Sequence, residues 1–331
     1  MTANELKDYL TAVVKSGLKH AVMIWGMPGI GKSSVVQAVC ADNNVDFIDV
    51  RLSQLMPSDL RGIPVPDDAV TQWYPPAFLP RSGCGVLFLD ELNMAAPSMQ
   101  GVAQQLILDR KVGDYCLPDG WFVWAAGNQK SAKAAVFDMP APLANRFLHL
   151  NLESCGQTFR QYAYRQQLHP DIIGFLSFRP DLLHSMHPSE PNWPSPRTWH
   201  MASDLHKATL DISPAVGASA ANEFAAFCSM QNQLPDCKAI LAGESCELTC
   251  HDPSVLYAII AALVVSVSSA NEAVHGFNWL RQQASKEWVH LFALELFPRL
   301  REIGHYAEFT RLLLKDADTR GFLTDFAQLM A

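Results

Sequence analysis

The sequence predicts an α/β fold, in which helices cover both faces of a parallel sheet, followed by an all-helical domain. Between Ala21 and Leu152, short apolar runs alternate with helical patterns, and this alternation is typical of a parallel sheet buried on both sides. After about residue 153 the strand signal fades and helical periodicity takes over. The length of 331 residues allows roughly two domains. We therefore expect one domain over residues 1–152 and a second over residues 153–331.

The elements of the first domain follow from these patterns. Mostly apolar runs predict strands at Ala21–Trp25, Asp46–Leu52, Gly85–Asp90, Trp121–Ala126 and Phe147–Leu152. Apolar residues at spacings of three and four predict helices at Lys32–Ala41 and Ser98–Asp109. Pro118-Asp119-Gly120 is a turn signal between two β-like runs. We interpret Lys111–Val123 as a β-hairpin whose second strand continues into the sheet.

The second domain shows helical patterns only. They span residues 154–168, 195–209, 221–230, 254–267 and 287–300. The most apolar run, Val255–Val265, is shorter than the about 20 residues that cross a bilayer, so we interpret it as a buried helix. Cys237, Cys246 and Cys250 lie near His251, but their spacing matches no paired zinc-ligand unit. The role of this cysteine cluster stays open.

The net charge indicates which kinds of partner to expect, and the first residues indicate the compartment. The formal net charge is −8, which argues against a nucleic-acid surface because such a surface usually needs a basic face. Glu5, Lys7 and Asp8 stand where a signal peptide would be apolar. We therefore expect a cytoplasmic protein with no membrane span.

A glycine-rich loop follows the first predicted strand. Residues Gly26 to Ser33 fit the pattern G-x-x-x-x-G-K-[ST] and stand between a predicted strand and a predicted helix, which is the context this motif needs. Glycines let backbone N–H groups close on phosphate oxygens, and the helix N-terminus adds its positive end. Lys32 would reach the β- and γ-phosphates of ATP, and Ser33 would hold Mg²⁺. The candidate nucleotide-binding residues are Gly26, Met27, Pro28, Gly29, Ile30, Gly31, Lys32, Ser33 and Ser34. The alternative is a tight turn that binds nothing.

Two acidic residues end another apolar strand. Asp90 follows Val86–Leu89, beside the expected position of the glycine loop, where Mg²⁺ needs a second protein contact. Glu91 is then placed to act as the general base on an attacking water. The alternative role for Asp90 is to cap the turn that follows.

Three further polar residues stand at the ends of predicted elements. Asn128 follows an apolar strand and is suited either to orient a water or to form an ordinary turn. Arg146 stands alone before a strand, as a helix C-terminal cap or as an arginine finger for a neighbouring subunit. Arg197 follows Ser195 as N-cap and Pro196 at the first helical position, which fixes its direction. Its plain alternative is a surface arginine.

These five pieces, in this order, resemble the AAA+ ATPases and more specifically their MoxR branch. The resemblance covers roughly residues 18–235 and implies an AAA+ αβα P-loop sandwich followed by a helical lid with a C-terminal helical extension. It assigns Walker A to Gly26–Ser33, Walker B to Val86–Glu91 and sensor 1 to Asn128. It assigns the arginine finger to Arg146 and sensor 2 to Arg197. The segment Pro57–Gly62 and the hairpin before Asn128 are also similar to that branch.

The chain departs from the family pattern at several positions, among them Ser33 where the family often has threonine. Asn145 precedes the finger arginine where an acidic residue is common, which puts the local positioning of Arg146 in question. Met94 stands after Asn93 where an arginine is frequent. The sequence therefore resembles a divergent MoxR subgroup.

The resemblance also implies function and partners. It implies a Mg²⁺-dependent ATPase that forms a homo-hexamer, in which Arg146 completes the neighbouring site and Arg197 senses the γ-phosphate. Such proteins are chaperone-like remodellers that act with a von Willebrand factor A-type domain protein on a protein client. The expected contact surfaces are Asp114–Gly120 and Pro57–Pro66.

Two other functions are compatible with the sequence. One is a DNA-directed AAA+ motor or loader, against which the acidic balance argues. The other is a nucleotide-binding switch without productive turnover, against which the presence of Glu91 argues.

Overall fold

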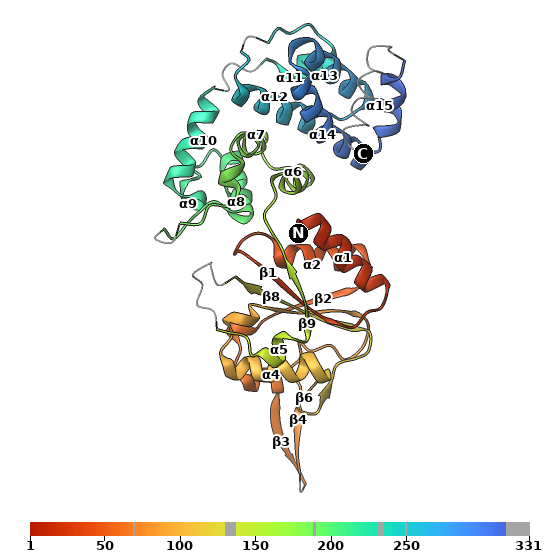
Figure 1. Ribbon diagram of the computed structural model, residues 1–331, viewed down its shortest axis with the longest axis vertical. Coiled ribbons are helices and arrows are strands. Elements are labelled where there is room, and N and C mark those ends of the chain that lie inside the picture. The colour runs from red at the N-terminus through yellow and green to blue at the C-terminus, as the bar shows by residue number, and fades with distance from the viewer. Residues whose placement is uncertain (69, 130–136, 188–189, 231–234, 249, 316–331) are drawn as a thin grey trace. The chain divides into compact units, whose positions relative to one another are not determined.

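The computed structural model describes residues 1–68, 70–129, 137–187, 190–230, 235–248 and 250–315. The chain divides into two compact units, Met1–Cys155 and Gly156–Ala331 (Figure 1). Unit 1 contains every strand found in the described part of the chain, and unit 2 is helical there. The expected fold class, an α/β sandwich followed by a helical part, is confirmed.

Unit 1 is built on a five-stranded sheet with the order β2-β5-β8-β1-β9. Every neighbouring pair in this sheet is parallel. The strands are β1 (Ala21–Gly26), β2 (Asp46–Arg51), β5 (Gly85–Asp90), β8 (Trp121–Asn128) and β9 (Phe147–Asn151). Because all five run in one direction, their carboxyl ends meet at one edge of the sheet, where parallel sheets usually bind ligands.

Helices cover both faces of this sheet, and alternation along the strands explains why. Val22 and Ile24 of β1 pack in one apolar cluster with α1 (Ala3–Lys15) and α2 (Lys32–Asp42). Ala21 and Met23 of the same strand pack in the opposite cluster with α4 (Pro97–Asp109). Successive side chains of a strand point to opposite faces, so an entirely apolar strand supplies two cores.

The predicted hairpin over Lys111–Val123 is wrong in its extent. Two-residue strands β6 (Lys111–Val112) and β7 (Tyr115–Cys116) pair antiparallel, with Gly113 in the left-handed region at φ 56° in the loop between them. Strand β8 pairs with β1 and β5 instead. The turn at Pro118-Asp119-Gly120 only redirects the chain into β8, where the Trp121 N–H donates to the Pro118 carbonyl at 3.1 Å.

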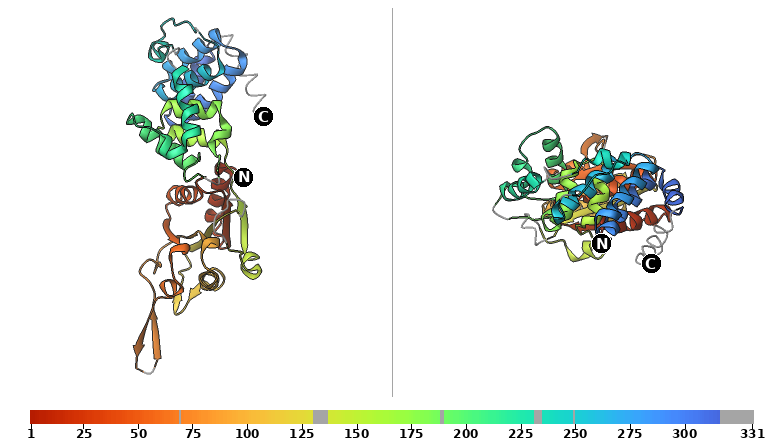
Figure 2. Two further views of the ribbon diagram at one scale, coloured as in Figure 1. Left: turned by 90° about the vertical axis from the view of Figure 1, so that its left-hand side faces the viewer. Right: turned by 90° about the horizontal axis from the view of Figure 1, so that it is seen from above.

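A second hairpin was not predicted. It follows the 3₁₀ helix η1 (Leu52–Gln54) and α3 (Pro57–Arg61), and consists of β3 (Ile63–Asp67) paired antiparallel with β4 (Val70–Tyr74). Figure 2 shows this hairpin extending away from the sheet of its unit. Pro64 and Pro66 lie within β3, and all five residues of that strand are exposed. Proline has no backbone N–H to donate to a neighbouring strand and is therefore confined to edge strands. With two prolines among five residues, the β3 stretch carries no clear strand signal in the sequence.

The remaining elements of unit 1 are η2 (Leu92–Met94) and α5 (Ala141–Ala144). Unit 2 begins with α6 (Gly156–Arg165), α7 (Pro170–Phe178), η4 (Pro180–Leu183), α8 (Pro196–Lys207), α9 (Ser213–Val216) and α10 (Ala218–Met230). It continues with α11 (Cys237–Ala242), α12 (Pro253–Ser266), α13 (Ala270–Gln283), α14 (Lys286–Glu302) and α15 (Tyr306–Leu313). The five predicted helical patterns correspond to α6, α8, α10, α12 and α14.

Unit 2 has one apolar core, and the apolar helix α12 lies within it. Its residues Val255, Ile259 and Leu263 are buried there. A Cβ on Gly174 of α7 would lie 3.0 Å from the Ala258 Cα, so these two helices approach closely at small residues. The interpretation of Val255–Val265 as a buried helix is confirmed. Within the described ranges, no helix has both the length and the apolarity needed to cross a membrane.

Candidate nucleotide-binding site

The glycine loop links β1 to α2 in the way that the motif requires. Strand β1 ends at Gly26, and α2 begins at Lys32 with Gly31 as its N-cap. Gly29 and Gly31 have φ values of 80° and 98°, in the left-handed region that a side chain disfavours. A glycine loop of this kind, placed directly before a helix N-terminus, is suited to bind phosphate oxygens through backbone N–H groups.

The Lys32 side chain extends from the start of α2 to the glycine loop and to the end of strand β8. Its Nζ donates to the Gly26 carbonyl at 2.9 Å, to the Met27 carbonyl at 3.2 Å and to Asn128 Oδ1 at 2.9 Å. The ammonium therefore sits between the loop and the tip of β8. Phosphate oxygens would replace these neutral carbonyl acceptors with charged ones, which form stronger hydrogen bonds.

Ser33 and Asp90 meet at the same edge. The Ser33 hydroxyl donates to Asp90 Oδ2 at 2.7 Å. Neighbouring oxygen ligands of an octahedral Mg²⁺ lie about 2.9 Å apart, since each lies about 2.1 Å from the ion. The spacing and the two oxygen ligands fit Mg²⁺ as adjacent ligands.

Partial burial and the nearby Asp90 raise the pKa of the Asp49 carboxyl on the neighbouring strand β2, and Glu91 adds to this effect.

Glu91 follows Asp90 in an uncommon backbone conformation. Its φ is 58°, in the left-handed region, and its N–H donates to Asp90 Oδ1 at 2.8 Å. Non-glycine residues in this region cluster at functional sites because the fold must hold them there. The Glu91 carboxylate accepts a hydrogen bond from the Ser53 hydroxyl of η1. No local sequence pattern points to Ser53, because the contact joins two segments far apart in the chain.

Asn128 is held at the tip of β8 by the buried residue Asn93. The Asn93 Nδ2 donates to the Asn128 carbonyl at 2.8 Å, and the Asn128 N–H donates to Asn93 Oδ1 at 3.1 Å. Asn93 is 2% exposed. A Cβ on Gly127 would lie 2.7 Å from Asn93 Oδ1, so glycine is needed for this close approach. Asn93 thus positions Asn128, which in turn contacts Lys32.

Most residues of this site lie in a segment that is similar to a known family. Residues 22–114 match the model of the AAA family, described as the ATPase family associated with various cellular activities. The match includes the glycine loop, Asp90, Glu91 and Asn93, whereas Asn128 lies beyond it. This segment is therefore similar to an AAA ATPase domain.

Solved structures that are similar to this chain include NtrX and RuvB. NtrX from Brucella abortus in complex with ADP is 15% identical over 94% of this chain and 67% of that chain, with a TM-score of 0.44. The Thermotoga maritima RuvB Holliday junction branch migration motor is 15% identical over 85% of this chain and 86% of that chain, with a TM-score of 0.41. A comparison with curated proteins found no match.

Arg146 lies at the amino edge of the sheet of unit 1. It is exposed and directly precedes β9, whose first residue Phe147 pairs with Ala21 at the start of β1. The glycine loop follows the opposite end of β1, about 16 Å away along five residues of strand. Arg146 therefore does not join Lys32, Ser33 and Asp90 within one subunit.

Arg197 belongs to unit 2 and lies outside the residues that match the AAA family. It is exposed in the first turn of α8. The predicted helix start is observed, because the Thr198 N–H donates to the Ser195 hydroxyl at 3.2 Å. The role of Arg197 as a nucleotide sensor stays a prediction.

The three cysteines near residue 240 are free thiols in the structure. Burial raises the pKa of the Cys237 thiol to about 11. The metal-compatible groups found in the described ranges do not include Cys237, Cys246 or Cys250.

Proposed function

We propose that this protein is a MoxR-type AAA+ ATPase that hydrolyses ATP with Mg²⁺ to remodel or activate a partner protein. The observation that supports this most is the meeting of Lys32, Ser33, Asp90 and Asn128 at the carboxyl edge of the sheet. A cation for the phosphates, an oxygen pair that fits a metal and an amide for water converge there. These groups are what phosphoryl transfer to water requires.

Each side chain then has one task in the reaction. The loop Gly26–Gly31 and Lys32 bind the phosphates, while Ser33 and Asp90 would hold Mg²⁺, which neutralises developing charge when bound. Glu91 accepts the proton of the attacking water, and Asn128 orients that water. The Ser53 hydroxyl donates to one oxygen of the Glu91 carboxylate, which leaves the other oxygen to accept from water.

The position of Arg146 supports a site completed by a second copy of the chain. It is exposed and at the amino edge of β9, so it is available to the nucleotide of a neighbour and remote from its own loop. An arginine finger typically contributes about 10³–10⁵ in rate. This supports a ring, with a homo-hexamer as the expected form.

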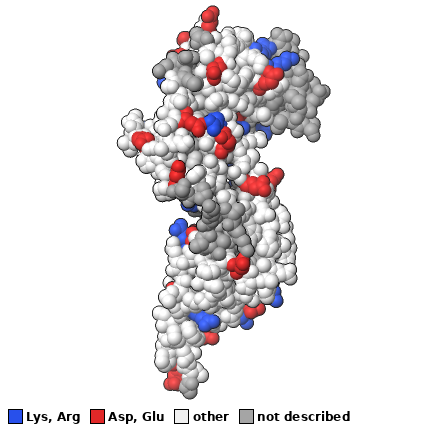
Figure 3. Space-filling model, turned by 60° about the vertical axis from the view of Figure 1, so that its left-hand side comes forward, with Lys and Arg blue, Asp and Glu red and all other residues white. Residues whose placement is uncertain are grey.

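A protein client fits the surface better than a nucleic acid. Ile63, Val70 and Tyr74 of the β3–β4 hairpin are 70%, 65% and 57% exposed, and exposed apolar groups of this kind mark protein contacts. On the face drawn in Figure 3, lysines and arginines lie among acidic side chains and form no broad basic area. We infer that the hairpin contacts the von Willebrand factor A-type partner or the client.

The first experiment separates ATP binding from turnover. Glu91→Gln keeps the shape of the side chain but removes the base, so we expect ATP binding to persist and hydrolysis to fall about 10²–10⁴-fold. Lys32→Ala is the matched control and should lose binding itself. Undiminished hydrolysis by Glu91→Gln would contradict the assignment of the base.

The second experiment identifies the partner. ATP-bound Glu91→Gln should retain the partner and client in a pull-down, whereas Lys32→Ala should not. Introducing Ile63→Asp and Val70→Asp into Glu91→Gln should abolish retention while thermal unfolding stays unchanged. Recovery of nucleic acid with stimulated hydrolysis would instead favour a DNA-directed motor.

A further inference from the structure

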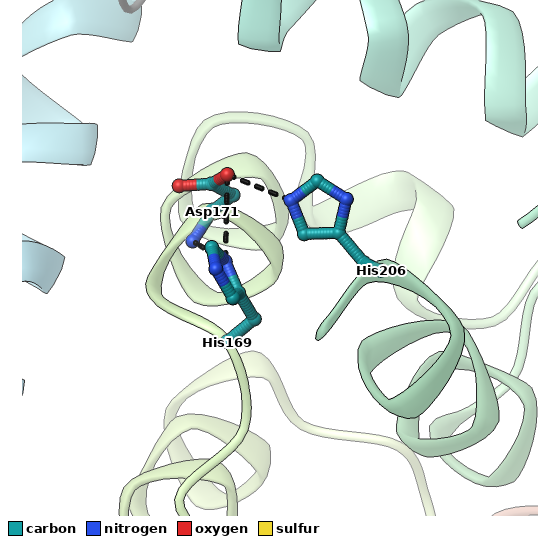
Figure 4. Close-up of side chains that lie close together, drawn as sticks. All are labelled: His169, Asp171 and His206. Atoms are coloured by element: carbon teal, nitrogen blue, oxygen red, sulfur yellow. Dashed lines mark hydrogen bonds and ion pairs between the residues drawn. The ribbon is translucent and has the colours of Figure 1, made fainter. Parts of the chain in front are cut away.

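Three metal-compatible side chains converge in unit 2, apart from the nucleotide site. His169 is the N-cap of α7, Asp171 lies in the first turn of that helix, and His206 lies in the last turn of α8. One potential ligand atom from each lies within 4.8 Å of the others. Figure 4 shows both imidazole rings directed toward the Asp171 carboxylate. No local sequence pattern points to this group, because Asp171 and His206 are 35 positions apart.

The distances match those within a metal coordination sphere. Asp171 Oδ2 lies 2.8 Å from His206 Nε2 and 3.4 Å from His169 Nδ1. Ligands of a tetrahedral zinc lie about 2.0–2.2 Å from the ion and therefore about 3.3–3.5 Å from one another. The observed separations, all within 4.8 Å, bracket this spacing.

Both imidazoles already contact the carboxylate of Asp171. His206 Nε2 forms an ion pair or hydrogen bond with Asp171 Oδ2 at 2.8 Å. His169 Nδ1 lies 3.4 Å from the same oxygen and accepts the backbone N–H of Asp171 at 3.2 Å. A nitrogen that accepts a hydrogen bond carries the lone pair that a metal ion needs, so His169 Nδ1 is suited to act as a ligand.

The ligand atoms of His169, Asp171 and His206 determine which cation fits this group. Two imidazole nitrogens with one carboxylate oxygen form a set suited to zinc and its transition-metal neighbours, whereas Mg²⁺ and Ca²⁺ prefer oxygen alone. The side chains of His169, Asp171 and His206 are 32%, 18% and 27% exposed, so an ion can enter from solvent. The nearby ammonium of Lys207 donates to the Gln167 carbonyl at 2.7 Å, which occupies that charge elsewhere.

We propose that His169, Asp171 and His206 bind one divalent transition-metal ion, with zinc as the physiological occupant. Three protein ligands leave one tetrahedral position for water. The ion ties the start of α7 to the end of α8. Since α8 carries Arg197 at its other end, the metal fixes the direction of that helix within unit 2.

The test uses the full chain, stripped of metal by a chelator and free of nucleotide. Zinc is titrated in competition with a chromophoric chelator, and Co²⁺ is then bound in its place to record the visible spectrum. The variants are His169→Gln and His206→Gln. The matched control is His200→Gln, which removes a histidine of α8 that contacts Tyr162 and lies outside the cluster.

We expect the wild type and His200→Gln to bind one more equivalent of zinc than either cluster variant. Loss of a ligand should weaken binding by more than the about 10–100-fold that follows loss of an outer-shell partner. Zinc should raise the melting temperature of the wild type and His200→Gln only. The Co²⁺ spectrum should lack the thiolate charge-transfer band that cysteine ligands give.

Two results would overturn the proposal. One is equal zinc binding by the wild type and by folded His206→Gln. The other is a strong thiolate band for the extra equivalent, which would assign the metal to some of the eight cysteines. Should the cluster variants fail to fold, the wild-type Co²⁺ spectrum decides alone, because an absent or thiolate-type spectrum rejects the site.

Discussion

At the scale of single residues, Asn93 organises the nucleotide site without being placed to touch the nucleotide. Its amide bonds both backbone groups of Asn128, whose own side chain accepts from Lys32. A two-point contact of this kind holds a backbone more firmly than one bond, because rotation about a single bond is then blocked. Asn93 is therefore a positioning residue for the tip of β8.

We predict that Asn93→Ala lowers both stability and turnover. Two buried backbone groups of Asn128 lose their partner, which should cost about 1–3 kcal/mol in the free energy of unfolding. Hydrolysis should fall more than ATP affinity, because Asn128 no longer stays aligned. Denaturant unfolding and steady-state ATPase assays measure the two effects.

The matched control is Asn43→Ala. Asn43 is the C-cap of α2, at the opposite end of that helix from Lys32. The Asn43 side chain donates to the Val39 carbonyl at 2.8 Å, so its loss should also lower stability. Turnover should remain at the wild-type level in this variant. Equal loss of turnover in both variants would mean that stability alone explains the result for Asn93.

At the scale of elements, a buried ion pair joins α6 to α14 in unit 2. The Arg160 guanidinium donates to Glu295, and their side chains are 18% and 7% exposed. Burial raises the pKa of the Glu295 carboxyl, while Arg160 and the Tyr164 hydroxyl oppose that rise. Arg160 and Glu295 line a cavity together with Arg165, Arg299 and Glu302. Removal of one partner leaves a buried charge without compensation, which is the costly case for such pairs.

We predict that Arg160→Leu destabilises the protein by about 3 kcal/mol at neutral pH. Without Arg160 the pKa of Glu295 rises further. A group with a raised pKa favours the folded state at low pH and loses that contribution as pH rises through its folded pKa. The destabilisation should therefore shrink when the pH falls from about 8 to about 5. Urea unfolding across that range measures it.

The double variant Arg160→Leu, Glu295→Leu tests the cause. Replacing both charges with apolar groups removes the unpaired carboxylate, so stability should return toward the wild-type value and lose the pH dependence of the single variant. A double variant as unstable as Arg160→Leu would show that packing, not charge, is responsible.

At the scale of the whole molecule, unit 1 holds the candidate nucleotide-binding residues and Arg146 at opposite edges of its sheet. Lys32, Ser33, Asp90 and Glu91 lie at the carboxyl edge of the sheet, and Arg146 lies at the amino edge of β9. The parallel arrangement of the strands imposes this separation. In the function proposed above, a second copy of the chain would supply Arg146 to this site.

We predict that two inactive variants restore activity when mixed. Arg146→Ala should lower turnover by about 10³-fold, and Glu91→Gln lacks the base. In mixed rings, Glu91 of the first variant meets Arg146 of the second, so some sites regain every group. ATPase activity of the mixture should exceed that of either variant alone.

Arg81→Ala serves as the control for loss of an arginine, since Arg81 is exposed and precedes β5 by four residues. It should hydrolyse ATP at the wild-type rate. Failure of the mixture to recover activity, with rings shown to form, would contradict a role for Arg146 in the neighbouring site.

The sequence by itself determined the elements whose causes are local. The glycine loop, the apolar strands that end in Asp90 and Asn128, and the Ser195 cap each depend on residues within a few positions of one another. The hairpin over Lys111–Val123 was misjudged because a turn signal tells where the chain bends, not which strands then pair. Only the tertiary structure brought Ser53 to Glu91, Asn93 to Asn128 and His206 to Asp171. Those contacts join residues far apart in the chain, and their distances depend on how whole strands and helices pack, which no local pattern encodes.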